Sequence, residues 1–343
     1  MFLTYDTVEA FALKRNPSVS FPFLKENGEL ISICVNSGVL IEPRALALYK
    51  DFYDNAYKFT QSYPQYYRFT LAMAIDLELG GMQGRESQKL AQYVDEDNFV
   101  MFDTSDVRRL ETLSMLLQTG ELSKANKQLL DDIIERVEIF IQNPAWYTKF
   151  NKPLFYDLTH IVFFLTDYGK KPTPLKIELF SCLMHIGTLA LLDNDADLLS
   201  ETCICLMYIG QAVPKYWDEY LTRYRDEIRI TFDGTIASAL NPTVDEYHIY
   251  LVLNAYHAAR GRPVFQDKFK SRTPSFSLPA RKATVLEKLS NFSHETYFTS
   301  RRRSASLDGF VSSLGEAEYL HWQSSLNSAP NGQDLVSGFS GLS

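Results

Sequence analysis

The sequence predicts an all-α fold built from successive helical hairpins. From Pro43 onward, apolar residues recur at helical spacing over a stretch of roughly 220 residues. Glycine, proline and asparagine interrupt this stretch at intervals that correspond to one or two helices. Hydrophobic residues make up 45% of the chain and charged residues 22%, which is typical of a chain that buries a sizeable core.

The first 42 residues contain the best strand candidates. Residues 29–36 (ELISICVN) are rich in apolar and β-branched side chains and lie between the turn signals Asn27-Gly28 and Ser37-Gly38. This pattern favours a short strand, or a hairpin with residues 39–41. We therefore expect residues 1–42 to form a small extended or hairpin segment packed on the main body.

The helical segments are of two kinds. Residues 124–142 are strongly amphipathic, as expected for an outer helix with one face in water. Residues 155–168, 201–209 and 247–256 are apolar nearly all round, as expected for inner helices. Outer and inner segments alternate, which predicts hairpins whose second helices gather at a centre.

The outer segment 124–142 also carries a possible metal motif. Its string Asp131-Asp132-Ile-Ile-Glu135 matches the DDxxE pattern of magnesium-dependent terpene cyclases. Because the helix is amphipathic, however, we interpret this string as a solvated face.

An internal repeat sharpens the hairpin prediction. Segments 71–80, 111–120, 160–169 and 201–210 each end in glycine, which suits the residue just past a helix, and 248–257 is a fifth copy without it. Four successive copies open on Glu111, His160, Glu201 and His248. Helix-start preferences explain the carboxylates but not the histidines, because a helix N-terminus disfavours imidazolium.

The shared position of these four residues predicts a metal site. In a closed ring of hairpins, equivalent positions on inner helices face one axis, and two histidines with two carboxylates suit Fe(II), Zn(II) or Mn(II). We expect His160, Glu201 and His248 to be ligands, and Glu111 to be a ligand or the catalytic base.

Four further residues are expected around that site. Asp157 and Asp245 each precede a histidine by three residues and are candidates to orient its ring. Asp167 and His257 lie further along the same segments and are expected to line the cavity wall.

The glycine-terminated hairpins resemble the α/α toroid shared by terpenoid cyclases, six-hairpin glycosidases and lanthionine-synthetase cyclases. The resemblance is architectural and covers roughly residues 43–265. It implies a toroid of five to six hairpins. Short helical segments at 285–292 and 315–326 would close the ring, so we place the toroid domain at residues 43–326, and the composition of the end predicts a flexible tail at 327–343. The Cys, Cys and His zinc ligands of the lanthionine cyclases have no counterpart in this sequence, nor does the Asp-rich acid motif of class II terpene cyclases.

Charge and cysteine content limit which partners and which cellular compartment we expect. A net charge of −8 argues against nucleic acid recognised through a broadly basic face. No run of 18 apolar residues and no signal-like N-terminus is present, so no membrane contact is expected. Cys34, Cys182, Cys203 and Cys205 lie in apolar sequence without a CxxC pair, which is typical of a reduced, cytoplasmic protein.

These observations predict a metal-dependent enzyme that acts on a small organic or peptide-derived substrate by oxygenase-like or Lewis-acid chemistry. Two alternatives stay open. One is a metal-free, glycosidase- or cyclase-like enzyme that uses Glu111 and Glu201 as an acid/base pair on a sugar or isoprenoid. The other is a non-catalytic helical scaffold that binds a protein partner. The serine- and arginine-rich run 300–306 is expected to be solvated, and the sequence carries no signal for the oligomeric state.

Overall fold

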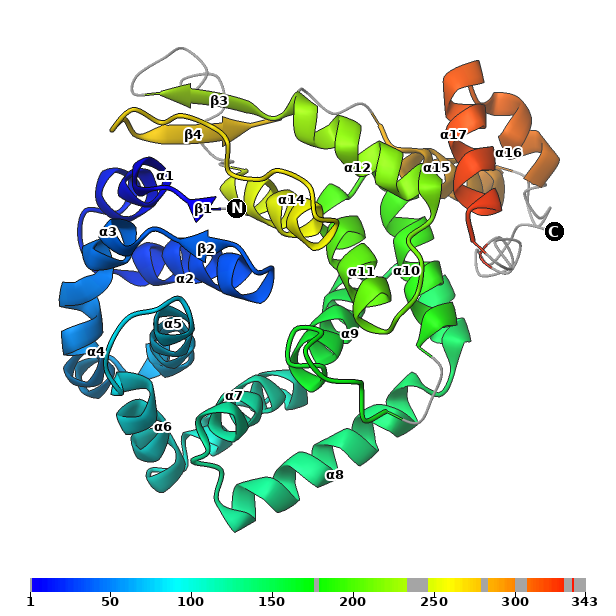
Figure 1. Ribbon diagram of the computed structural model, residues 1–343. Coiled ribbons are helices and arrows are strands. Elements are labelled where there is room, and N and C mark those ends of the chain that lie inside the picture. The colour runs from blue at the N-terminus through cyan, green and yellow to red at the C-terminus, as the bar shows by residue number, and fades with distance from the viewer. Residues whose placement is uncertain are drawn as a thin grey trace. The chain divides into compact units, whose positions relative to one another are not determined.

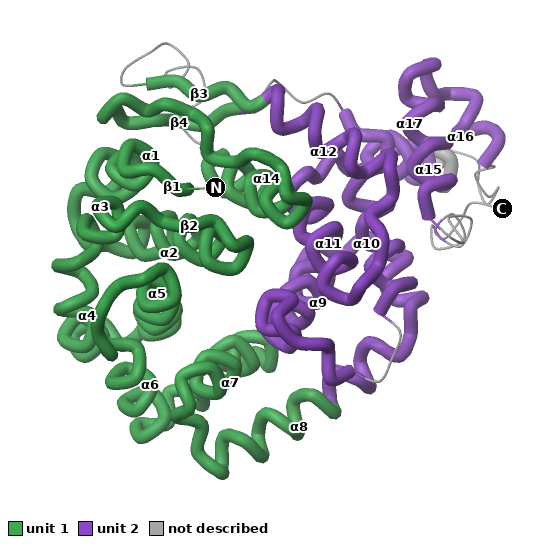
Figure 2. Tube along the Cα trace, viewed as in Figure 1, with its two compact units in different colours: residues 1–135, 228–277 green, residues 136–227, 278–343 purple. Residues whose placement is uncertain are grey.

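The computed structural model describes residues 2–175, 179–232, 246–278, 283–299, 307–329 and 335. These residues are predominantly helical with two very small sheets, which confirms the predicted helical class (Figure 1). The chain divides into two compact units (Figure 2). Unit 1 comprises residues 1–135 and 228–277, and unit 2 comprises residues 136–227 and 278–343.

Unit 1 contains the N-terminal helices and a later segment that returns to them. Its elements are β1 (Phe2–Leu3), α1 (Tyr5–Glu9), the π-helix Ala10–Arg15, α2 (Phe21–Asn36), β2 (Leu40–Ile41), α3 (Pro43–Leu46), the 3-10 turn Ala47–Tyr49, α4 (Lys50–Ser62), the 3-10 turn Pro64–Tyr66, α5 (Tyr67–Leu79), α6 (Glu86–Glu96), the 3-10 turn Phe99–Phe102, α7 (Asp106–Thr119), β3 (Arg229–Phe232), α14 (Tyr247–Ala259) and β4 (Pro274–Ser277). Helix α8 (Lys124–Ile141) contains the boundary at residue 135.

The expectation of an extended N-terminal segment is wrong. Residues 29–36 belong to α2, whose N-cap Ser20 accepts a hydrogen bond from the N–H of Phe23. The buried side chains of α2 recur every three or four residues, which is helical rather than strand spacing. Residues 40–41 do form a strand, but it pairs in parallel with β1 at the N-terminus.

Helix α2 belongs to the core of unit 1, where it packs against α5 and α14. Leu24, Leu30 and Ile31 of α2 are fully buried, as are Leu71 and Leu77 of α5. Residues 1–42 are therefore an integral layer of this unit and not an appendage on it.

A buried ion pair fastens the N-terminal segment within unit 1. Arg15 donates two hydrogen bonds to the carboxylate of Glu26 on α2, at 2.7 and 3.0 Å, and a third to the carbonyl of Pro274 on β4. Its guanidinium also lies over the rings of Phe11, Tyr247 and Phe276. One side chain thus joins segments that are about 260 residues apart in sequence.

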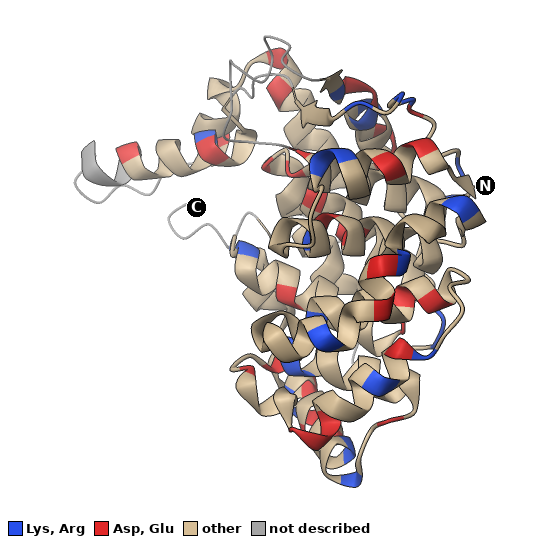
Figure 3. Cartoon of the chain, turned by 90° about the vertical axis from the view of Figure 1, so that its left-hand side faces the viewer, with Lys and Arg blue, Asp and Glu red and all other residues tan. Residues whose placement is uncertain are grey.

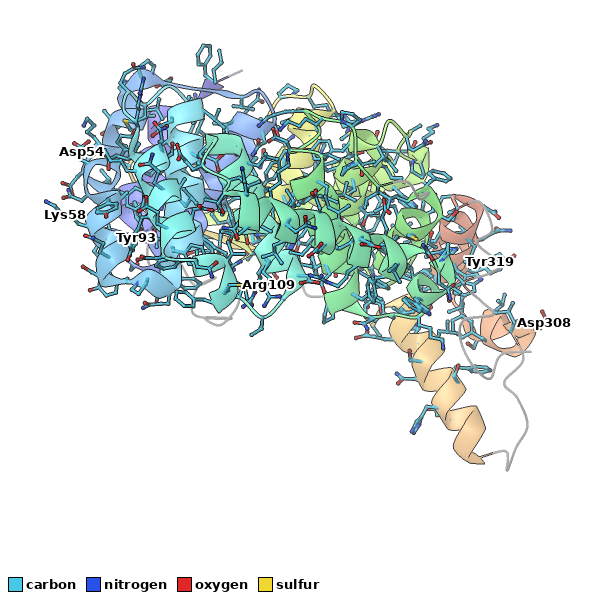
Figure 4. All side chains as sticks on the ribbon, turned by 90° about the horizontal axis from the view of Figure 1, so that it is seen from below. Asp54, Lys58, Tyr93, Arg109, Asp308 and Tyr319 are labelled. Carbon is cyan, nitrogen blue, oxygen red and sulfur yellow. The ribbon has the colours of Figure 1, made fainter. Side chains whose placement is uncertain are left out.

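The described residues of unit 2 form helices joined by turns and loops, with no strand among them. Its elements are the 3-10 turn Pro144–Thr148, α9 (Lys152–Leu165), α10 (Phe180–Leu192), α11 (Ala196–Tyr208), α12 (Lys215–Glu227), α15 (Val285–Thr299), α16 (Leu307–Ser313) and α17 (Glu316–Asn327). Figure 4 shows α15 extending past α16, on which Asp308 is labelled, and past α17, on which Tyr319 is labelled.

The expected alternation of outer and inner helices does not hold in unit 2. Helices α10 and α11 are consecutive, pack on each other, and are both almost entirely buried. Helix α10 is enclosed because α15, α17 and the turn Pro144–Thr148 also pack against it.

The solvated face of α8 is as expected. Asp131, Asp132 and Glu135 are exposed, whereas Ile133 and Val137 are buried. The DDxxE string therefore points to solvent.

The five repeat segments all fall on helices, namely α5, α7, α9, α11 and α14. Gly120 and Gly210 have the left-handed backbone expected of a residue just past a helix, and Gly169 has one in the turn that follows the end of α9 at Leu165, whereas Gly80 keeps a right-handed one. Glu111, His160 and Glu201 lie well inside their helices, and only His248 lies in a first turn. Helix-start chemistry therefore does not account for the first three.

In the described residues, no helix is long and apolar enough to cross a membrane. Acidic and basic positions are interspersed along the helices in Figure 3. All four cysteines are buried, and none of them forms a disulfide. The run 300–306 and most of the segment 327–343 lie outside the described residues, although Leu335 is described and buried.

Candidate functional site

The candidate site lies along the contact between α9 and α11 in unit 2. Asn151 caps α9 by accepting from the N–H of Leu154, and Pro153 pre-sets the first turn. Asp195 caps α11 in the same way through the N–H of Leu198. These caps set where each helix begins, and the two helices pack directly on each other.

A lysine and two aspartates form the first polar contact along this line. The Nζ of Lys152 lies 2.8 Å from a carboxylate oxygen of Asp195 and 3.6 Å from one of Asp193. Burial lowers the pKa of Lys152, but the hydrogen bond to Asp195 and the two negative charges outweigh it, so the pKa is raised. Burial raises the pKa of Asp193, and Lys152 only partly offsets this.

One helical turn further on, the hydroxyl of Tyr156 donates to Oδ2 of Asp197 at 2.7 Å. Burial is the main cause that raises the pKa of this phenol well above its ordinary value, and the charges of Asp197, Asp195 and Glu201 add to it. Tyr156 is therefore a permanent hydrogen-bond donor that orients the Asp197 carboxylate.

The next turn brings together two residues that the repeat had singled out. The hydroxyl of Thr159 donates to Oε2 of Glu201 at 2.6 Å, and Nε2 of His160 lies 3.8 Å from the same oxygen. The Glu201 side chain is only 7% exposed, whereas that of His160 is 42% exposed. A buried carboxylate thus meets an imidazole that solvent can reach.

Asp197 and Glu201 are one turn apart on α11, and they bring carboxylate oxygens within 4.8 Å of each other. Like charges this close repel each other, especially where burial reduces screening by water. Within unit 2, the hydroxyls of Tyr156 and Thr159 donate to these carboxylates, and the His160 imidazole lies near Glu201. A positive charge beside these two carboxylates would offset this repulsion.

The other two predicted ligands lie in unit 1. Glu111 on α7 accepts a hydrogen bond from Arg68 on α5, and Arg68 also lies 3.6 Å from Asp103. His248 on α14 contacts Glu29 on α2, with Nδ1 and Oε2 3.0 Å apart. Because these residues and the pair His160 and Glu201 belong to different units, the convergence of all four stays a prediction.

The structure describes three of the four residues expected to orient the histidines or line the cavity wall. Asp157 is exposed on α9, and its charge helps raise the pKa of the buried Tyr147, after burial itself and Cys182. Asp167 lies within ion-pair distance of Lys170 and Lys171. His257 is buried in α14 of unit 1, and Asp245 lies outside the described residues. Their proposed roles stay predictions.

Sequence reasoning missed three contributors, namely Tyr156, Thr159 and Asp197. Asp197 lies in the first turn of α11, where an acidic residue is common for helix-start reasons alone. The signal that was available is its spacing: Asp197 precedes Glu201 by four residues, as Tyr156 precedes His160, so each pair shares one face of its helix. Polar pairs one turn apart on otherwise apolar helices indicate a polar contact between those helices.

Fold and site together define a predominantly helical protein with a partly buried row of carboxylates, hydroxyls and one imidazole between two helices of unit 2. The chain belongs to the family described as a domain of unknown function, DUF6902, which matches residues 4–335. No curated protein and no solved structure matches the chain.

Proposed function

We propose that this protein is a metal-dependent enzyme whose ion is held in unit 2 by His160, Glu201 and Asp197. The observation that carries the proposal is the placement of the His160 imidazole 3.8 Å from the buried Glu201 carboxylate, with Asp197 one turn away. Nε2 of His160 and Oε2 of Glu201, 3.8 Å apart, can share one ion at about 2.0–2.2 Å from each, and we propose that the Asp197 carboxylate turns toward the same ion.

The proposed ligands limit which metal ion the site would select. One imidazole and two carboxylates suit Zn(II), Fe(II) or Mn(II), and they are a poor match for ions that select thiolates. Thr159 and Tyr156 support the proposal because each donates a hydrogen bond to a proposed ligand carboxylate, and such hydrogen bonds commonly hold metal ligands in orientation. The proposed ion does not require Glu111 or His248.

The ion supplies Lewis-acid or redox chemistry when bound. The residues of the chain hold it and keep its environment partly dry. The exposed side of His160 is where a small organic or peptide-derived substrate reaches the site. The α/α-toroid arrangement remains a proposal carried by the sequence repeat, and a cytoplasmic location remains one carried by the pattern of cysteines.

Metal content tests the proposal directly. Protein purified without chelators, or stripped and then titrated with Zn(II), Fe(II) or Mn(II), should bind about one equivalent of ion. Glu201→Gln and His160→Gln should weaken binding by at least about tenfold, because each removes a ligand atom. The Co(II) form offers a second readout through its visible absorption bands.

Two exposed residues of unit 2 provide matched controls. Glu219→Gln on α12 and His294→Gln on α15 make the same chemical changes on exposed side chains and should leave binding unchanged. Absence of stoichiometric binding for all three metals would refute the proposal, and so would full binding by Glu201→Gln. Circular dichroism of each variant verifies that the fold is kept.

A further inference from the structure

Aromatic side chains extend from the proposed metal site along the end of α9. The His160 ring lies 6.2 and 6.0 Å from the rings of Phe163 and Phe164, measured between centroids. Phe163 is in turn stacked on Tyr168 and meets the edge of Tyr208. We call Phe163, Phe164, Tyr168 and Tyr208 the aromatic shelf. All four side chains are half-buried, so part of each ring remains accessible.

The shelf depends on an unusual backbone. Asp167, Tyr168 and Gly169 are three consecutive residues with left-handed φ values of 49°, 52° and 80°. This conformation is unfavourable for a bulky residue such as tyrosine, whereas asparagine or glycine adopts it readily. It returns the chain so that the ring of Tyr168 lies on Phe163 and against Phe164.

Gly169 completes the turn by its lack of a side chain. A Cβ atom there would lie 2.3 Å from the ring of Tyr208, so only glycine lets Tyr208 approach. The turn is held by hydrogen bonds from the N–H of Tyr168 to the carbonyl of Phe163 and from the N–H of Gly169 to the hydroxyl of Thr166. Strained backbone that is held this firmly is typical of functional positions.

The four shelf rings are less buried than the aromatic core of this unit. A core aromatic cluster would be fully buried, as Phe155 is elsewhere on α9. Here the rings keep accessible area and lie at angles from 20° to 78° to one another, so they present both faces and edges. Faces and edges together complement the quadrupole of another aromatic ring.

We propose that the aromatic shelf binds a planar, unsaturated ring of the substrate and places its substituent beside His160 and Glu201. The proposal rests on the proposed function for its second half, because the substituent is what the bound ion acts on. The first half, recognition of an aromatic ring, stands on the shelf alone.

Binding of two matched small alcohols tests the first half. Benzyl alcohol and cyclohexylmethanol share a hydroxymethyl group and differ in whether their ring is planar and aromatic. Ligand-observed NMR titration of the full-length protein should show benzyl alcohol binding about fivefold more tightly. Phe164→Leu keeps apolar volume but should abolish this preference.

Tyr168 allows a test that does not depend on strain. Tyr168→Asn accepts the left-handed backbone while removing the ring, so it should fold normally yet lose the preference for benzyl alcohol. Tyr168→Phe keeps the ring and should bind both alcohols as the wild type does. Equal binding of the two alcohols to the wild type would overturn the proposal, as would an unchanged preference in both Phe164→Leu and Tyr168→Asn.

The same titration separates this proposal from the metal proposal. It is repeated on stripped and metal-loaded protein and on Glu201→Gln. If the wild type prefers benzyl alcohol but binds none of the three metals when titrated with them, the proposed function is refuted and the shelf is supported. If the wild type binds a metal stoichiometrically but shows no preference for benzyl alcohol, the proposed function is supported and the shelf proposal is refuted.

Discussion

Replacing Arg15 by methionine tests whether the N-terminal segment is part of the core of unit 1. The side chains of Arg15 and Glu26 are 8% and 11% exposed, and two hydrogen bonds join them. Removing the arginine leaves a carboxylate in a nearly dry setting, with the amide of Asn16 as one remaining donor at 2.8 Å. Breaking a buried ion pair in this way typically costs about 3–5 kcal/mol of the free energy of unfolding.

Urea denaturation followed by far-UV circular dichroism measures this cost. Tryptophan fluorescence would not serve, because Trp146, Trp217 and Trp322 all belong to unit 2. The double variant Arg15→Met/Glu26→Met should recover most of the loss, because it removes both charges and keeps apolar volume. If Arg15→Met unfolded within about 0.5 kcal/mol of the wild type, the ion pair would be shown to contribute nothing and our reasoning would fail.

Two further predictions concern unit 2. Burial lowers the pKa of His321 below its ordinary value of 6.5, so the folded state disfavours its proton. The free energy of unfolding should then fall as the pH drops from about 6.5 through the lowered pKa, by at most about 1.4 kcal/mol per pH unit. Denaturation midpoints across this range should be flatter for His321→Gln, and an equal slope would contradict the assignment. Gly187→Ala on α10 should lower the unfolding free energy by about 1–3 kcal/mol, since its Cβ would lie 2.3 Å from ring atoms of the fully buried Trp217. Higher stability from the better helix propensity of alanine would show that Trp217 moves aside without cost.

The segment 29–36 illustrates where sequence reasoning fails. Its short apolar run suits either a strand or a buried helix, since periodicity alone does not separate the two. Seen over residues 21–36, the buried positions follow a helical spacing, and the Ser20 cap provides a start. The error came from treating Asn27-Gly28 as a turn signal. Asn27 instead lies buried within α2, where its Oδ1 accepts a hydrogen bond from the hydroxyl of Tyr49.

The candidate site was partly predictable. The repeat placed His160 and Glu201 at equivalent positions, and the structure brings them together on neighbouring helices of unit 2. The same register did not indicate that Glu111 contacts Arg68 or that His248 contacts Glu29. Nor did it indicate the donors Tyr156 and Thr159. Such partners come from other helices or from neighbouring turns, and a count of repeat positions contains no information about them.

By itself the sequence determined that the chain is helical, where many helices end, and which α8 residues face water. These properties depend on hydrogen bonds, caps and periodicity among residues close along the chain. Only the tertiary structure decided that the N-terminal segment belongs to the core, that α10 is enclosed, and that α9 and α11 share a polar row. Such outcomes depend on which surfaces pack together, so residues far apart in sequence determine them jointly.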